Sequence, residues 1–319
     1  MQKKQRVLIL GATGFIGRNL AEKFCDDPRF EVVLGYNVKP KYKINNGRWI
    51  RADLTHYNEV HQIIKNIDIL IQSAAATSGS KDIINSPEIH VTDNAIMNSL
   101  ILREAYRNNL KHIIFFSCTT MYRSDPINKQ SEESFSEYSH IYPKYFGLAS
   151  TKIYIEKLCE FYSSLSETKF TVIRHSNIYG PWDKFDLARS HVMGATITKI
   201  LTAKKDIVIW GNGTEIRDFL FVDDLVDLVV KALFEQKDKF LLINAGSDTG
   251  ISIAELTELV AGIAGKKLNL KFDKTKPTLN FSFISDSAKV KKTLGWHAIT
   301  PLHEGVEKSL DWWQKNSRV

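Results

Sequence analysis

Cysteine is scarce in this sequence, and long hydrophobic runs are missing. The three cysteines, Cys25, Cys118 and Cys159, form neither a disulfide framework nor a metal-binding spacing. Basic residues near the N-terminus precede an apolar run, but glycines interrupt this run after residues 7–10. It is too short for a signal peptide or a membrane span, and no later segment qualifies. We therefore expect a cytoplasmic protein that has no metal site and does not bind membranes.

A block of basic residues interleaved with aromatic residues is also missing. The net charge is +7, from 43 lysines and arginines against 36 acidic residues, but the lysines are scattered along the chain. Scattered charge is typical of a solvated basic surface, so we do not expect nucleic-acid binding. The excess of positive charge also suits an anionic small-molecule substrate.

The stretch that organises the chain runs from residue 6 to residue 17 and reads RVLILGATGFIG. Residues 7–10 are typical of a buried parallel strand, and Gly11, Gly14 and Gly17 follow at three-residue spacing. An amphipathic helix begins near Phe15. In such a unit the first glycine makes a tight turn, the second lets the backbone approach a pyrophosphate, and the third lets the helix pack closely on the strand. The N-terminus of the helix then faces the phosphates. The stretch predicts dinucleotide binding; the alternative is an ordinary glycine-rich turn.

Short apolar runs and amphipathic segments alternate along the rest of the chain, as in α/β proteins. Strands are predicted at 7–10, 30–34, 48–51, 67–71, 112–117 and 170–174, and helices at 56–65, 87–109 and 146–163. We predict a Rossmann-type doubly wound parallel sheet in a dinucleotide-binding domain of residues 1–175. Part of 215–245 returns to this domain, and residues 176–319 form mainly a smaller α/β substrate lobe.

The end of the second strand bears on the choice of dinucleotide. NAD-binding folds usually carry an acid there for the ribose 2′-OH, but this sequence has Tyr36 and Asn37, with Lys39 and Lys41 close behind. The missing acid favours a 2′-phosphate, and thus NADP, unless the lysines are only solvated loop charges. The cofactor is therefore expected to be NAD or NADP.

Three further positions near the strand ends have two interpretations each. Asp53 follows the third strand and either meets the adenine or belongs to a helix N-cap region. Ala74 and Ala75 follow the fourth strand, where small residues let a cofactor ribose pass. Asn94 lies inside a predicted helix, where asparagine is unfavourable, and is either a polar anchor under the site or a solvated side chain.

Short motifs follow one another in a fixed order along nearly the whole chain. They are the glycine turn, Asn94, the hydroxyl cluster before Tyr122, Lys152, NIYGP at 177–181, WGNG at 210–213, RDFLFVDD at 217–224, DSAK at 286–289 and LGW at 294–296. This ordered set resembles the extended short-chain dehydrogenases/reductases that act on nucleotide sugars. Within that family it is most similar to the GDP-L-fucose synthase branch, whose loop matches residues 179–192 in length. His191 occupies the position of that branch's epimerisation histidine.

Two positions depart from the family pattern. The family's active-site motif is Tyr-x-x-x-Lys on one helix, and with Lys152 as the lysine the tyrosine position holds Leu148. The cysteine that partners the epimerisation histidine is replaced by Thr120. The family's catalytic Ser/Thr falls on Cys118 or Thr119, and Thr119 is preferred on chemical grounds.

The resemblance implies a set of site residues. The catalytic residues are expected to be Thr119, Lys152 and His191, and the substrate-binding residues Thr120, Asn177 and Arg217. The cofactor-binding residues are expected to be Gly11, Thr13, Gly14, Phe15, Ile16, Gly17, Asn37, Asp53, Leu54, Ala74, Ala75 and Lys152. Another group would have to exchange protons in place of the missing tyrosine. The candidates are Thr119, a bound water, and one of Tyr138, Tyr142 and Tyr145.

The resemblance also implies the reaction. It is NAD(P)-dependent oxidation or reduction at one carbon, C4, of a nucleotide-diphosphate sugar, with a GDP-hexose or GDP-heptose as the substrate class, in surface polysaccharide synthesis. A redox-silent sensor of dinucleotides or nucleotide sugars, and a nucleotide-sugar epimerase, are the alternatives. Because Leu148 cannot exchange protons, we expect slow turnover with a tightly held cofactor, which a second substrate such as a keto acid would reoxidise.

The resemblance finally implies assembly into a homodimer or larger homo-oligomer. The helices near 87–109 and 146–163 match those that pair as a four-helix bundle between subunits of the family. The residues expected to supply the apolar surface are Ile96, Leu100, Ile101, Ile153 and Leu158.

Overall fold

A parallel sheet of seven strands forms the larger part of the protein. The computed structural model describes residues 4–38, 41–77, 86–136, 140–187, 189–276 and 278–316. The sheet has the order β10-β6-β5-β4-β1-β2-β3, and every neighbouring pair is parallel. Its strands are β1 Gln5–Leu10, β2 Phe30–Tyr36, β3 Gly47–Arg51, β4 Ile69–Gln72, β5 His112–Cys118, β6 Lys169–His175 and β10 Phe240–Ala245. The strand order reverses between β1 and β4, so the predicted Rossmann-type parallel sheet is confirmed.

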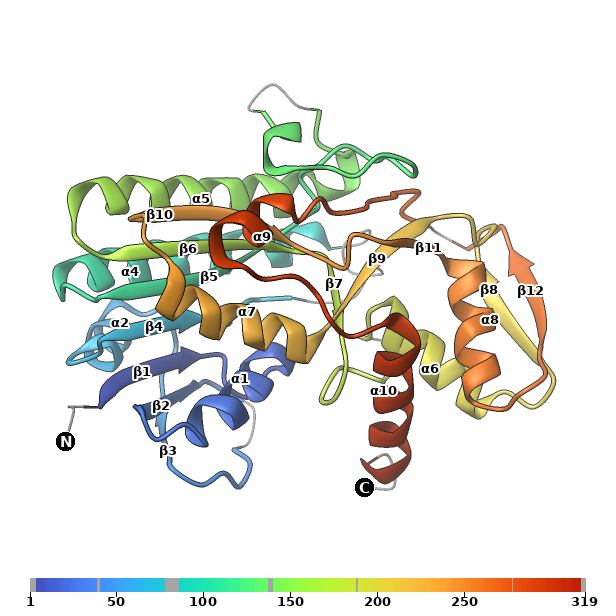
Figure 1. The fold of residues 1–319 in the computed structure, drawn as a ribbon, viewed down its shortest axis with the longest axis horizontal. Coiled ribbons are helices and arrows are strands. Elements are labelled where there is room, and N and C mark those ends of the chain that lie inside the picture. Colours follow the sequence, from blue (N-terminus) through green and yellow to red (C-terminus); the bar gives the residue numbers. More distant parts are fainter. Residues whose placement is uncertain are drawn as a thin grey trace.

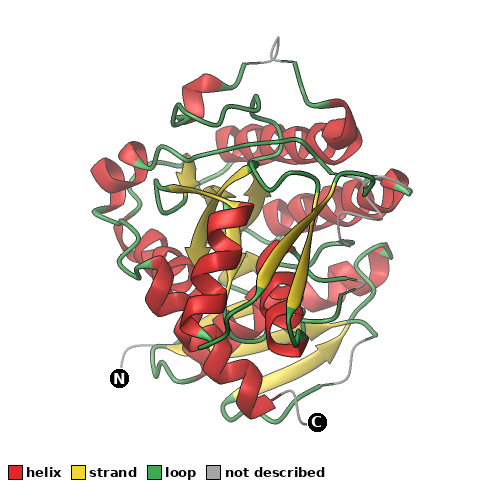
Figure 2. Cartoon of the chain, turned by 90° about the vertical axis from the view of Figure 1, so that its right-hand side faces the viewer, coloured by secondary structure: helices red, strands yellow, loops and turns green. Residues whose placement is uncertain are grey.

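Helices cover both faces of this sheet (Figures 1 and 2). On one face lie α1 Phe15–Cys25, α7 Val222–Glu235 and the short α9 Ala288–Leu294; on the other lie α2 Tyr57–Ile64, α4 Thr92–Arg107 and α5 Phe146–Leu165. Short 3-10 turns at Pro87–His90, Glu132–Ser134 and Pro143–Tyr145 complete this part of the chain. The central strands β1, β4 and β5 are largely apolar because both of their faces are buried, whereas the edge strand β3 is partly exposed.

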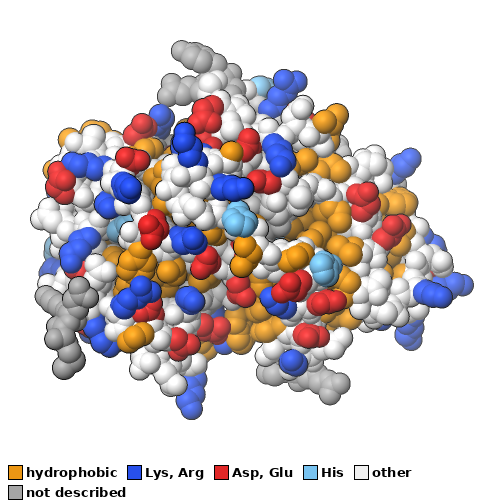
Figure 3. Space-filling view, viewed as in Figure 1, with side chains coloured by type: hydrophobic (Ala, Val, Ile, Leu, Met, Phe, Trp, Pro, Cys, Tyr) orange, Lys and Arg blue, Asp and Glu red, His pale blue; other side chains and the backbone are white. Residues whose placement is uncertain are grey.

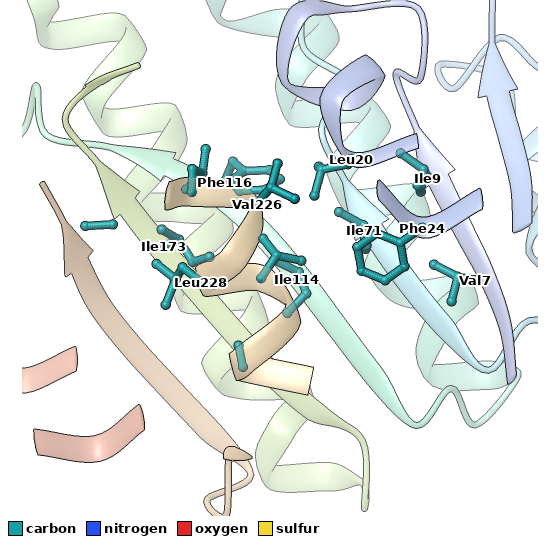
Figure 4. Packing of buried hydrophobic residues seen from close by; sticks show 14 of the residues in the cluster. Val7, Ile9, Leu20, Phe24, Ile71, Ile114, Phe116, Ile173, Val226 and Leu228 are labelled. Carbon is teal, nitrogen blue, oxygen red and sulfur yellow. The ribbon is translucent and has the colours of Figure 1, made fainter. Parts of the chain in front are cut away.

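The apolar core on the α1 and α7 face shows how the two helices are held (Figure 4). Phe24 of α1 packs with Val7 and Ile71 of β1 and β4, while Leu228 of α7 packs near Ile173 of β6. All five side chains are at most 1% exposed. Tight packing of this kind fixes the start of α1 against the end of β1.

A smaller group of strands and helices lies beyond the carboxyl edge of the large sheet (Figure 1). It contains the three-stranded sheet β11-β9-β7 and the two-stranded sheet β12-β8. The strands are β7 Asn177–Tyr179, β8 Asp206–Trp210, β9 Ile216–Phe221, β11 Gly250–Ser252 and β12 Asn269–Asp273, and the helices are α6 Val192–Thr202, α8 Ile253–Ile263 and α10 Leu302–Asn316. Between β9 and β11 the chain returns to the large sheet through α7 and β10. The division into domains at residue 175 stays a prediction.

Asp218 of the RDFLFVDD motif and Trp296 of the LGW motif hold segments of the chain together. The carboxylate of Asp218 is fully buried and accepts hydrogen bonds from the backbone N–H and hydroxyl of both Ser247 and Ser285. The indole of Trp296 is also buried and donates to the carbonyl oxygen of Asp224 at 3.1 Å. These bonds tie the C-terminal segments to β9 and α7.

The apolar surface of α4 and α5 differs from the predicted one. Ile101 is fully buried in the core, so its assignment to a subunit interface is wrong. Leu100 and Leu158 pack partly against the same core, Ile153 packs against a small cluster that includes Tyr122, and Ile96 is 41% exposed. The exposed apolar side chains of α5 are Phe146, Tyr154, Phe161 and Leu165.

Charge is mixed over the surface. On the face shown in Figure 3, basic and acidic side chains alternate, with apolar side chains between them. This agrees with the scattered lysines of the sequence. Among the described residues, no helix is long and apolar enough to cross a membrane.

The junction of β1 and α1 leaves no room for a side chain at Gly17. A Cβ atom there would overlap the carbonyl oxygen of Gly11 and lie 2.8 Å from the hydroxyl of Ser73. That hydroxyl itself donates to the carbonyl oxygen of Leu10 at 2.5 Å, so neither neighbour can move freely. The third glycine therefore permits the close approach of α1 to the strand end.

Replacing Gly17 by alanine is expected to destabilise the protein by ~1–3 kcal/mol, the range for inserting a methyl group into packed structure. Denaturant unfolding followed by circular dichroism measures this. Gly262 is the matched control, because it also lies in a helix but a Cβ there meets no atom within 4 Å. Gly262→Ala is expected to stabilise by up to ~1 kcal/mol through helix propensity. Equal effects of the two substitutions would contradict the packing argument.

Candidate functional site

The N-terminus of α1 forms an open cradle beside β4. Its N-cap is Gly14, no side chain caps the helix, and its first turn carries no acidic residue. Gly11 has a φ of +76°, and a Cβ there would lie 2.7 Å from the backbone nitrogen of Ala74. The free N–H groups at the start of such a helix bind phosphate. The missing side chain of Gly11 lets the end of β4 lie against the turn. These residues fit the pyrophosphate of NAD or NADP.

An arginine held between two aromatic rings braces this cradle. The guanidinium carbon of Arg18 lies 3.9 Å from the ring centroid of Tyr42 and 3.0 Å from that of Trp182. Tyr42 donates its hydroxyl proton to the carbonyl oxygen of Ala12 at 3.1 Å. The side chain of Asn19 donates to the carbonyl oxygen of Pro181 at 3.0 Å. The glycine turn is thus tied both to the segment after β2 and to the segment after β7, which the sequence patterns did not indicate.

The residues predicted near the adenosine half differ in their surroundings. Asn37 is exposed, Leu54 is buried, and Lys39 lies outside the described residues. The carboxylate of Asp53 accepts hydrogen bonds from the backbone and hydroxyl of Thr55 at 3.0 and 2.7 Å, which lowers its pKa. These bonds close the turn ahead of α2, whose N-cap is His56, and the contact of Asp53 with an adenine stays a prediction.

Asn94 anchors the segment that follows β4. Its side chain exchanges hydrogen bonds with the backbone N–H and carbonyl of Ala76, at 3.0 and 2.9 Å, and also donates to the carbonyl oxygen of His90. At 5% exposure it is not a solvated asparagine. The polar-anchor interpretation therefore agrees with the structure, and the anchor fixes the strand end where Ala74 is half-buried and Ala75 exposed.

Lys152 projects from α5 to the carboxyl end of β5. Its Nζ donates to the carbonyl oxygen of Phe116 at 2.7 Å and lies 4.7 Å from the ring centroid of Phe115. Desolvation lowers the pKa of this amine, opposed by the nearby Cys118 and Glu156. One helical turn earlier, Leu148 is half-buried at the position of the family's tyrosine.

The last residue of β5 brings a thiol close to this lysine. Cys118 is half-buried, its Sγ lies 2.9 Å from the hydroxyl oxygen of Thr120, and burial raises its pKa against the charge of Lys152. Thr119 is 8% exposed. Of the two positions considered for the family's Ser/Thr, Cys118 interacts electrostatically with Lys152.

Of the tyrosines considered as substitutes for the missing one, Tyr145 belongs to the apolar cluster against which Tyr142 and Cys118 pack. Tyr145 is 7% exposed and packs edge-on to Phe281 at 5.2 Å. Burial raises the pKa of its phenol to about 12, against the charge of Arg217. Tyr142 packs against the same two rings, and Tyr138 lies outside the described residues.

Two histidines complete the group around Lys152. His191 is the N-cap residue of α6, and burial lowers its pKa to about 4, together with the charges of Lys184 and His90. His175 ends β6, and burial, Lys152 and His191 lower its pKa to about 4 as well. The sequence analysis did not single out His175; its place directly after a buried strand and before NIYGP was the available signal.

The predicted substrate-binding residues of the second half, Asn177 and Arg217, both form hydrogen bonds within the protein. Arg217 is 8% exposed, with its Nη2 2.8 Å from a carboxylate oxygen of Glu215. It is therefore not a solvated loop arginine. The side-chain NH₂ of Asn177 donates to the carbonyl oxygen of Asp218 at 2.9 Å, so this group holds β7 against β9.

The predicted site residues thus fall into two groups, one around Lys152 and one around the glycine turn. Cys118, Lys152, His175 and His191 form one chain of electrostatic neighbours, which Tyr145 extends to Arg217. The glycine turn, Asn37 and Asp53 belong to the β1–β3 side of the sheet. Among the described residues, no cluster of three or more His, Cys, Asp or Glu side chains could hold a metal ion.

The sheet order and the uncapped glycine turn define a dinucleotide-binding protein of the Rossmann type. The model of the NAD dependent epimerase/dehydratase family matches residues 7–246. The chain belongs to this family, which confirms the predicted nicotinamide cofactor and leaves the choice between NAD and NADP open.

Relatives match nearly the whole length of the chain. It is 30% identical to a GDP-L-fucose synthase of Sinorhizobium fredii over 96% of this chain and 95% of that protein. It is 26% identical to a GDP-L-colitose synthase of Yersinia pseudotuberculosis over 98% of this chain and 99% of that protein. A GDP-6-OMe-4-keto-L-xylo-heptose reductase from C. jejuni shares the fold, with a TM-score of 0.83 at 20% identity and 99% coverage of both chains.

A buried carboxyl group in the segment before His191 predicts a pH dependence of stability. Asp183 is 8% exposed, one of its oxygens accepts the backbone N–H of Lys184 at 2.7 Å, and burial raises its pKa to about 7. The unfolded chain has the ordinary lower pKa, so the folded state binds the proton more tightly. Stability is therefore expected to fall as pH rises from about 4 to about 7.

Asp183→Asn keeps the acceptor oxygen but cannot ionise. Its melting temperature, compared with that of the parent between pH 5 and pH 8, isolates this group. The parent should lose stability relative to the variant as the pH rises. An unchanged difference between the two proteins across this range would contradict a raised pKa of Asp183.

Proposed function

We propose that this protein uses a nicotinamide dinucleotide to oxidise or reduce C4 of a GDP-hexose or GDP-heptose in surface polysaccharide synthesis. The observation that carries the proposal is the placement of Lys152 beside Cys118 at the carboxyl end of β5, at the same sheet edge as the uncapped glycine turn. Ligands of open α/β sheets bind at this edge. The GDP-sugar enzymes among the relatives support the substrate class.

The side chains of the site have separate roles in this reaction. When bound, the nicotinamide supplies the hydride chemistry at the sugar carbon. The cationic form of Lys152 stabilises negative charge that develops on a sugar oxygen, and its bond to Phe116 fixes the direction of the amine. Cys118 and the hydroxyl of Thr120 offer weak donors to the same oxygen. Arg217 offers a guanidinium to the substrate diphosphate.

Both alternatives have less support. Epimerisation next to a carbonyl needs two opposed proton-transfer groups, and Thr120, at the position of the branch's cysteine, is too weak an acid to be one of them. A redox-silent sensor would explain Leu148. However, a sensor does not need both Lys152 and His191 close to His175. We also infer a cytoplasmic location, since Cys25, Cys118 and Cys159 are all unpaired.

Absorbance of the purified protein tests the redox function. Reduced nicotinamide, retained through purification or added, is expected to give its near-ultraviolet band. Mixing with a keto acid should bleach that band, and a GDP-hexose or GDP-heptose should restore it. If no GDP-sugar of either class changes the redox state, the sensor interpretation replaces the enzyme.

Arg217→Ala is expected to weaken GDP-sugar binding by ~1.5–3 kcal/mol, the range for hydrogen bonds to charged groups. Calorimetric titration of the GDP-sugar measures this, and dinucleotide affinity should not change. Arg107→Ala is the control, because that arginine is exposed on α4. Equal GDP-sugar affinity in the parent and the Arg217 variant would show that the diphosphate binds elsewhere.

We further propose that two copies pair through α4 and α5. The support is the exposed apolar side chains on this helix pair, including Ile96, Tyr154, Phe161 and Leu165, which are 41–53% exposed. Phe161→Glu is expected to shift a dimer to monomers in analytical ultracentrifugation. Phe234→Glu on α7, 47% exposed in the parent, is the control and should leave assembly unchanged. A parent that sediments as a monomer at all concentrations would refute the pairing.

A further inference from the structure

His175 lies at the edge of the sheet where the proposed reaction takes place. It is the last residue of β6 and pairs in parallel register with Cys118, the last residue of β5. Paired residues of neighbouring parallel strands point to the same face of the sheet. His175 is half-buried, and its ring lies 6.2 Å from that of Phe116, whose carbonyl oxygen holds Lys152.

The hydrogen bond of its ring fixes the tautomer. Nδ1 lies 2.8 Å from the carbonyl oxygen of Ser176. A carbonyl oxygen only accepts, so Nδ1 carries the proton, and Nε2 of the neutral ring then has a free lone pair. Within the described part of the chain, Nε2 makes no hydrogen bond. A neutral imidazole held in this way is oriented as a proton acceptor.

The surroundings of the ring keep it neutral. Burial contributes most to lowering the pKa of His175 to about 4, against the hydrogen bond to Ser176. The cationic Lys152 from α5 acts in the same direction as burial, while His191 from the start of α6 has a lowered pKa of its own and Cys118 is the register partner on β5. At neutral pH the ring is therefore uncharged, and Nε2 carries no proton.

We propose that Nε2 of His175 exchanges the proton of the reacting sugar hydroxyl, in place of the tyrosine that Leu148 replaces. In the oxidation direction the O–H bond breaks and an N–H bond forms at Nε2. The electron pair of that O–H bond becomes the second bond of the carbonyl, and the carbon's hydrogen leaves as hydride to the oxidised nicotinamide. The imidazolium then returns its proton to solvent. This assignment rests on the proposed redox function.

The other proton-active groups of the site are less suited to this role. Tyr145 is buried with a pKa of about 12, so it holds its proton too firmly to act as a base near neutral pH. The amine of Lys152 is engaged by the carbonyl oxygen of Phe116. The thiol of Cys118 has its pKa raised by burial.

Nitrogen NMR of protein labelled with ¹⁵N-histidine tests the assignment without turnover. The proposal requires a neutral His175 ring at pH 7 with the proton on Nδ1 and a bare Nε2. The signal is assigned by its loss in His175→Asn. A ring protonated on Nε2 at pH 7 would overturn the proposal, whether or not the enzyme is active.

Kinetics of His175→Asn test the role itself. The asparagine amide can still donate to the carbonyl oxygen of Ser176, but it cannot take up a proton. General acid–base help is typically worth ~10²–10⁴-fold, so kcat is expected to fall by at least ~10²-fold. Affinity for the GDP-sugar and for the dinucleotide should stay within about threefold of the parent. A normal kcat, or a loss confined to KM, would overturn the proposal.

A matched control separates catalysis from the loss of a buried histidine. His112 is buried at the opposite end of the same sheet, where its Nε2 lies 2.8 Å from the hydroxyl of Thr171. His112→Asn is expected to lower the melting temperature but leave kcat unchanged below the melting temperature. If it lowers kcat as much as His175→Asn does, the effect is structural and the proposal falls. A parent that binds GDP-sugars without hydride transfer contradicts the proposed function itself, whereas an active parent with an equally active His175→Asn contradicts only the role of His175.

Discussion

The buried ion pair between Glu156 and Arg174 is the interaction on which the site depends. The two side chains approach to 2.6 Å at about 5% exposure, and Glu156 also accepts the hydroxyl of Ser117. Each partner adjoins the site: Glu156 lies one helical turn after Lys152, and Arg174 directly precedes His175. Removing one partner of such a pair typically costs about 3–5 kcal/mol, because the other charge stays buried. The pair therefore locks α5, β5 and β6 into the one arrangement that brings lysine, thiol and imidazole together.

A second constraint joins the glycine turn to the rest of the molecule. Arg18 between Tyr42 and Trp182 links the start of α1 to segments on both sides of it. The carboxylate of Glu22 accepts from Arg18 at 3.2 Å and from the indole of Trp182 at 3.3 Å. A guanidinium is weakly hydrated and is attracted by aromatic rings, so placing it between them costs less free energy than burying an ammonium group. The dinucleotide cradle and the segment before His191 are thus held in fixed relation.

The departures from the family pattern gather in one place. Leu148 lies one helical turn before Lys152, and Thr120 contacts Cys118, which interacts with Lys152. The glycine turn, by contrast, keeps the three-residue glycine spacing. Changes confined to the proton-exchanging side of a site alter the reaction more than the binding of the cofactor. This distribution supports a nucleotide-sugar oxidoreductase whose proton chemistry has been rebuilt on the same sheet.

The sequence by itself determined the sheet, the glycine turn and the family, because strand burial and glycine spacing are local patterns that a chain carries wherever it folds. It also predicted a site role for Lys152 and left Asn94 open between a polar anchor and a solvated side chain. Only the tertiary structure decided that Ile101 belongs to the core and that Arg217 is buried against Glu215. It alone paired His175 with Cys118, since strand register and burial arise from contacts between segments far apart in sequence.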